Sequence, residues 1–177
     1  MNHDERLQRQ HEVLRRLSTL PRMILMLNDR DNSPEFVLHD LCHPTCFNLH
    51  KAAYFVDNPD FDCVHGIAGV SRDEVNFVSN DIWDNQEEFS TVMHGSPFNN
   101  QVRNVEGQSI KKYNGSEKEW VDKLAHMLGI VQPTACTWNM KHDNYGMLIF
   151  ERAAFDESDL DEYLVNGVSL LSFCPIY

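Results

Sequence analysis

The chain has 177 residues and a formal net charge of −12 at pH 7, and 42% of its residues are hydrophobic. This length and composition predict one globular domain with a sizeable core and argue against disorder throughout. The negative charge repels nucleic-acid phosphates and anionic lipids, so neither is an expected partner. Arginines are frequent near the start, but Asp4, Glu5 and Glu12 interleave with them, which is typical of a solvated helix face.

The sequence favours a cytoplasmic protein. No run approaches the roughly 20 apolar residues that a membrane span needs. The first residues, Met-Asn-His-Asp-Glu-Arg, are too polar for a secretory signal. Five cysteines, an odd number at irregular spacing, fit a reducing compartment, where they would be free thiols, metal ligands or buried small side chains.

Residues 1–30 form an N-terminal helical segment ahead of a domain over residues 31–177. Within it, an apolar stripe recurs at alternating steps of four and three residues: Val13, Leu17, Leu20, Ile24 and Leu27. This stripe suits a partner helix, and therefore a homodimer, but packing on the domain's own core explains it equally well. We expect a kink or a break at Pro21, because proline removes a helical hydrogen bond.

A second helix and a hairpin follow. Ser33 caps this helix, with a proline after it, and Pro44 ends it. Strands over residues 52–56 and 63–70 flank the turn Asp-Asn-Pro-Asp at residues 57–60 and form the hairpin.

Residues 71–112 have weaker patterns. They predict a strand over 75–78, a helical turn over 85–93, a short helix over 98–105 and a short strand over 109–112.

The last third of the chain, residues 116–173, has the clearest pattern, which reads helix, strand, turn, strand, helix. Ser116, with a glutamate three residues later, forms a capping box at the first helix. Strands over 134–139 and 145–150 flank a polar turn. Asp156 caps the closing helix.

Several stretches resemble the GAF domain, a small-molecule sensor module. Residues 95–108, Gly-Ser-Pro-Phe-Asn-Asn-Gln-Val-Arg-Asn-Val-Glu-Gly-Gln, resemble the segment that precedes a strand in that family. Residues 135–140 and 144–150, with the run Gly-x-Leu-x-Phe, resemble its last hairpin, and residues 155–160 resemble the start of its closing helix. The resemblance extends over residues 15–173.

The resemblance implies an α+β fold with a central antiparallel sheet of about five or six strands flanked by helices. It also implies a small ligand held between the sheet and a covering segment, here residues 75–105. PAS and profilin-like folds are the related alternatives. The Asn-Lys-Phe-Asp-Glu signature of cyclic-nucleotide-binding members is absent, and the cysteine positions do not match those of methionine sulfoxide reductase members. No output domain follows, so the chain would act on a separate partner protein or be a fragment.

Three side chains are candidates for lining a ligand site. Trp83 is a large aromatic flanked by polar loop residues. Cys136 and Trp138 alternate along one strand, so they share a face that points either to the ligand or to the core. Nothing in the sequence identifies the ligand or a cofactor.

The densest group of reactive side chains is His39, Cys42, His43, Cys46 and His50. On a continuous helix they would share a face, and thiolates and imidazoles bind zinc or iron, so a metal, haem or redox site is one hypothesis. Against it, Pro44 interrupts the helix and the spacing matches no zinc motif. Cysteines also commonly fill a core.

Enzyme activity is the less favoured interpretation. Ser96 and Cys136 are the candidate nucleophiles, but no Gly-x-Ser-x-Gly elbow and no glycine-rich phosphate loop is present. The sequence therefore favours a sensory or regulatory domain that binds a small molecule and signals through protein contacts. The alternatives are a ligand-free interaction domain and a metal- or redox-dependent sensor or enzyme.

Overall fold

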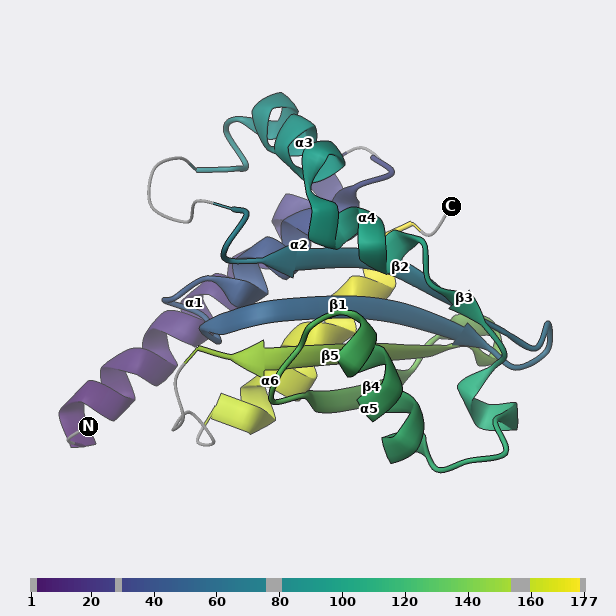
Figure 1. The fold of residues 1–177 in the computed structure, drawn as a ribbon. Coiled ribbons are helices and arrows are strands. Elements are labelled where there is room, and N and C mark those ends of the chain that lie inside the picture. The colour runs from purple at the N-terminus through teal and green to yellow at the C-terminus, as the bar shows by residue number, and fades with distance from the viewer. Residues whose placement is uncertain (1–2, 28–29, 76–80, 154–159, 176–177) are drawn as a thin grey trace.

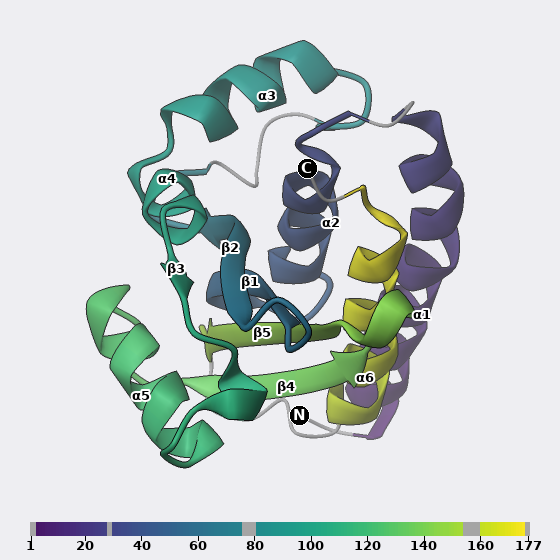
Figure 2. The ribbon, with the colours of Figure 1, turned by 90° about the vertical axis from the view of Figure 1, so that its right-hand side faces the viewer.

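The computed structural model describes residues 3–27, 30–75, 81–153 and 160–175. Over these residues, five antiparallel strands form one sheet that lies between two layers of helices (Figures 1 and 2). The predicted α+β class is therefore confirmed.

The sheet has the strand order β3-β2-β1-β5-β4, and every neighbouring pair is antiparallel. The strands are β1 (Leu49–Asn58), β2 (Cys63–Ser71), β3 (Glu106–Gly107), β4 (Thr134–Asn139) and β5 (Tyr145–Arg152). Both predicted hairpins, β1–β2 and β4–β5, are confirmed. The central strand β1 reads as a continuous apolar run because helices cover both of its faces.

The helices of the described residues surround this sheet. They are α1 (His3–Met26), α2 (Ser33–Cys42), α3 (Gln86–Gly95), α4 (Pro97–Arg103), α5 (Glu117–Met127) and α6 (Asp161–Val168). Short 3-10 turns are η1 (Ile110–Lys112), η2 (Lys141–Asp143) and η4 (Ser169–Phe173). The predicted capping box of α5 is confirmed: Ser116 and Glu119 each accept the other's backbone N–H at 3.2 Å.

Two hydrophobic clusters lie on opposite faces of the sheet. Helices α1, α2 and α6 with η4 pack on the face that contains Tyr54 and Phe150. Helices α4 and α5 pack on the face that contains Phe55 and Ile149. Adjacent residues such as Tyr54 and Phe55 go to different clusters because side chains alternate along a strand.

The apolar stripe of α1 packs on the domain's own core. Its members are buried in or packed against the first cluster: Val13, Leu17, Leu20, Ile24 and Leu27. The stripe is thus used within one chain and is not available to a partner helix. Helix α1 continues through Pro21, so the proline does not break it, and a kink there stays a prediction.

Helix α4 closes one edge of the sheet. Beyond its short pairing with β3, strand β2 bonds to the region of α4: Gly66 N–H donates to Val105 O at 2.9 Å, and Gly69 N–H donates to Asn99 Oδ1 at 2.8 Å. A Cβ added at Gly66 would overlap the carbonyl oxygen of Val102. The two glycines of β2 therefore let a helix lie where another strand would otherwise pair.

The expected strand over residues 109–112 is wrong. Those residues include η1, because the buried carboxylate of Asp57 accepts the N–H groups of Ile110 and Lys111 at 3.2 and 3.3 Å and closes a turn. The strand that pairs with β2 is β3, two residues earlier in the chain.

The expected cap at Ser33 is also wrong. Asn32 precedes the helix, and the Ser33 hydroxyl instead donates to Arg30 O at 2.6 Å. Val75 is not in a strand, and the rest of the expected strand over 75–78 lies outside the described residues, as does the expected cap Asp156.

We predict that Gly66→Ala lowers the free energy of unfolding by about 3 kcal/mol or more. The added methyl overlaps a backbone carbonyl, which cannot move aside by a change of rotamer as a side chain can. Gly95→Ala is the matched control. Nothing lies within 4 Å of a Cβ at that position, so its effect should stay within about 1 kcal/mol. Urea unfolding of the two variants measures both values. Equal effects would contradict the close packing of α4 on β2.

Candidate ligand-binding site

Aromatic side chains stack on the sheet face that α2 and η4 cover. The rings of Tyr54 (β1) and Trp138 (β4) lie 5.7 Å apart at an interplanar angle of 15°. The Trp138 indole N–H donates to Ser172 Oγ at 2.8 Å. The fully buried Tyr54 hydroxyl donates to Met140 Sδ at 3.7 Å. A thioether is a weak acceptor, so this hydroxyl can make a stronger bond with another partner.

Cys136 lies on the same face of β4 as Trp138, as the alternation predicts, and both pack against the first cluster. Burial raises the pKa of the Cys136 thiol to about 12, while a hydrogen bond with the backbone of Leu148 opposes the rise. The thiol is therefore protonated near neutral pH and is a poor nucleophile.

A buried acid lies on α2. Glu35 is 1% exposed; its Oε1 accepts from Asn99 Nδ2 at 3.1 Å and pairs with Arg103 Nη2 at 2.9 Å. Among the described residues, the other oxygen, Oε2, is buried and has no hydrogen-bond partner. Burial raises the pKa of Glu35, and the charge of Arg103 and the bond from Asn99 oppose the rise.

Cys174, which follows η4, is buried in the first hydrophobic cluster. Burial, and then the charge of Glu35, raise the pKa of the Cys174 thiol to about 12. Burial, and then Cys174, raise the pKa of Tyr54. Tyr54 and Cys174 belong to the first cluster, and α2, which carries Glu35, packs on the same face of the sheet. Glu35 Oε2 has no hydrogen-bond partner among the described residues, and the Tyr54 hydroxyl has only the thioether of Met140.

Trp83 packs against the same cluster as Cys136 and Trp138, but its direct contacts are with other residues. Its indole N–H donates to Asp40 Oδ2 at 2.9 Å, and its ring packs 5.2 Å from that of Phe36. Arg16 of α1 pairs with the other oxygen of Asp40 at 3.3 Å. These contacts tie the segment before α3 to α1 and α2. They do not group Trp83 with the two candidate residues of β4.

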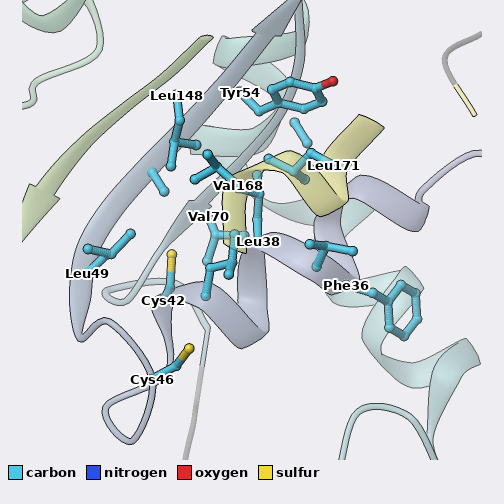
Figure 3. Packing of buried hydrophobic residues seen from close by; sticks show 14 of the residues in the cluster. Phe36, Leu38, Cys42, Cys46, Leu49, Tyr54, Val70, Leu148, Val168 and Leu171 are labelled. Carbon is cyan, nitrogen blue, oxygen red and sulfur yellow. The ribbon is translucent and has the colours of Figure 1, made fainter. Parts of the chain in front are cut away.

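The candidate metal-ligand cysteines lie in the hydrophobic core. Cys42 and Cys46 are fully buried members of the first hydrophobic cluster (Figure 3). Burial raises the pKa of both thiols, that of Cys46 to about 12, and this disfavours the thiolate that binds metal. Among the described residues, no three histidine, cysteine or acidic side chains are arranged to hold a metal ion.

Two of the three histidines of that group, His43 and His39, contact other side chains. Helix α2 ends at Cys42, so His43 leaves the helical face, and its Nδ1 lies 2.8 Å from Thr45 Oγ1. The His39 ring packs edge-on against Phe89 at 5.2 Å. The shared helical face that the hypothesis requires is therefore not formed.

Ser96, a candidate nucleophile, caps the start of α4. Its hydroxyl donates to Glu74 and accepts the Asn99 N–H at 3.0 Å, which caps α4. This is the capping role that the absence of a nucleophile elbow favours.

Sequence reasoning missed Glu35 and Tyr54. The available signal was a charged or hydroxylated residue within an apolar run, Pro-Glu-Phe-Val-Leu for one and Ala-Ala-Tyr-Phe-Val for the other. Comparisons with protein-family models, curated proteins and solved structures found no match. In the part of the chain described here, no helix is long and apolar enough to cross a membrane.

The stability difference between the wild type and Glu35→Gln should depend on pH. The folded-state pKa of Glu35 is raised above its ordinary value of 4.5, so in the window between these pKa values the folded state binds more protons than the unfolded state. Glu35 therefore contributes its full stabilisation below about pH 4.5, its ordinary pKa. This contribution falls as the pH rises through the folded-state pKa. Urea titrations should show that the free energy of unfolding of the wild type rises relative to that of the variant as the pH is lowered. A constant difference would exclude a raised pKa.

Proposed function

We propose that the chain is a regulatory domain of the GAF type that binds a small molecule on the sheet face covered by α2 and η4. The observation that carries the proposal is the buried, unpartnered Glu35 Oε2, together with the Tyr54 hydroxyl, whose acceptor is only a thioether and whose ring stacks on Trp138. A buried polar atom without a partner costs about 1–3 kcal/mol, and a ligand that supplies the partner offsets that cost.

The architecture supports the GAF resemblance. Residues 95–108, on which the resemblance rests, end α3, form α4 and lead into β3, and residues 135–150 span the β4–β5 hairpin. A PAS or profilin-like fold with the same kind of central sheet is the alternative. Cytoplasmic location, expected from the sequence, is part of this proposal.

The ligand we propose has a planar or apolar body and a hydrogen-bond donor. The aromatic rings and the thioether of Met140 suit such a body. The donor would bond to Glu35 Oε2. The Tyr54 hydroxyl would exchange its sulfur partner for an oxygen or nitrogen of the ligand. No part of this binding requires a metal or a nucleophile.

Signalling would use the outer surface of α1 and α6 with η4. Of the ten large hydrophobic side chains exposed among the described residues, six lie on these elements: Leu7, Leu14, Leu25, Met26, Val165 and Phe173. Helix α1 also carries five arginines and three acidic residues in a chain of net charge −12. Arg9 and Arg16 bond to Cys46 O and Asp40 within the chain, and the other three arginines are Arg6, Arg15 and Arg22. We therefore propose an acidic amphipathic helix of a signalling protein as the partner. The ligand would influence this surface through η4, which carries Ser172 and contacts α1.

The second candidate is a ligand-free interaction domain. The observation that favours it is the same exposed row of side chains, which serves a protein partner whether or not a ligand binds.

Thermal unfolding with a panel of small metabolites tests ligand binding. A ligand at about 100 times its Kd should stabilise the protein by about 2.7 kcal/mol, which raises Tm by a few degrees. Tyr54→Phe keeps the ring and removes the hydroxyl, so the shift should shrink. Tyr113→Phe is the matched control, because Tyr113 packs against the cluster on the opposite face.

Two outcomes would count against the ligand site. In the first, no member of the panel raises Tm. In the second, a ligand raises Tm but Tyr54→Phe and Tyr113→Phe respond to it alike, which would place binding elsewhere on the molecule.

A further inference from the structure

The two edges of the sheet differ. The outer edge of β2 is occupied, because its N–H groups at Gly66 and Gly69 donate to Val105 and Asn99. The other edge is β4, which forms the outer margin of the sheet (Figures 1 and 2). Within the described ranges, the backbone of β4 has no hydrogen bonds other than those of its pairing with β5.

The sequence of β4 lacks the usual protection of an edge strand. It reads Thr-Ala-Cys-Thr-Trp-Asn, with no charged residue, proline or glycine in a chain of net charge −12. Proteins commonly place lysine, proline or a bulge on such an edge to prevent pairing with another chain. Thr134, Thr137 and Asn139 are exposed, so the strand is accessible.

We propose that β4 pairs antiparallel with β4 of a second copy of this chain, joining two five-stranded sheets into one. Two features favour a second copy as the occupant. The strand is neutral, so self-pairing places no like charges opposite each other. At the opposite edge, β3 has only two residues and α4 lies beside the rest of β2, so the pairing closes as a two-fold dimer. The pairing uses the backbone edge of β4, and the proposed ligand site uses the Trp138 side chain of the same strand.

The two-fold axis limits the register. A two-fold axis normal to the sheet keeps each side chain on its own face. Residues that lie opposite each other must therefore have side chains on the same face of the sheet. Two registers pair five residues of each strand. One places Cys136 opposite Cys136 of the second copy and Ala135 opposite Thr137. The other places Thr137 opposite Thr137. In both registers Thr137 lies at the axis or next to it.

The experiment measures mass by light scattering over micromolar concentrations. The wild type should reach twice the 20.6 kDa chain mass. Thr137→Lys places like charges near the axis in either register, so the dimer Kd should rise at least about tenfold. Thr91→Lys, an exposed threonine on α3, is the matched control and should leave Kd unchanged. Leu14→Lys on α1 tests the alternative of a dimer that forms through α1. This variant should also leave the dimer Kd unchanged.

Salt dependence gives a second readout. Two copies of net charge −12 repel, and a neutral strand contributes no ion pairs to screen, so the dimer should tighten as ionic strength rises. Amide hydrogen exchange should show protected β4 amides in the wild-type dimer and faster exchange in Thr137→Lys. If Thr137→Lys does not fold, Asn139→Lys at the end of the strand replaces it.

Several results would overturn the proposal. They are a wild type that stays monomeric, a dimer that Leu14→Lys dissociates while Thr137→Lys does not, and β4 amides protected only when a peptide from another protein is added. A ligand-induced Tm shift in a monomeric wild type would overturn the pairing and leave the proposed ligand site intact.

Discussion

The arrangement of the molecule depends on one buried asparagine. Asn99 Oδ1 accepts the Gly69 N–H of β2, and its Nδ2 donates to Glu35 Oε1 of α2 and to Met93 O of α3, both at 3.1 Å. A single side chain therefore joins the edge of the sheet to two helices. In an interior of low dielectric these bonds are strong, and losing one leaves a buried polar group unpaired. The glycines of β2 let α4 bring Asn99 close enough.

This network bears on both proposals, the ligand site at Glu35 and the pairing at the sheet edge. Asn99 and Arg103 bind one oxygen of Glu35, and the other oxygen, which has no partner among the described residues, is the one that we propose binds a ligand. Asn99 and Val105 accept two N–H groups on the outer side of β2, and we propose β4 as the edge at which a second sheet pairs. The proposed ligand site and the proposed pairing surface both use β4: Trp138 contributes its ring to the first, and the backbone edge of the strand forms the second.

Local patterns predicted the fold class and most elements. Alternation identified the β4–β5 hairpin, and the capping box at Ser116 identified the start of α5. Prediction failed where a distant residue decided the local structure. Asp57 turned the residues around Ile110 into a 3-10 turn, and that contact crosses 53 positions of sequence. The metal hypothesis assumed that α2 continued past Cys42, whereas the helix ends there and its cysteines join the core.

By itself the sequence determined what depends on neighbours a few positions apart: helical and strand periodicity, caps, turns, and the shared face of Cys136 and Trp138. The tertiary structure alone decided whether the α1 stripe packs on the domain's own core or on a partner helix. It also decided which polar atoms lie together. Asn99 bonds to residues 30 and 64 positions away, and the order of residues does not reveal such distances. Burial also sets the pKa of Glu35 and of the thiols, because desolvation depends on everything packed around a group.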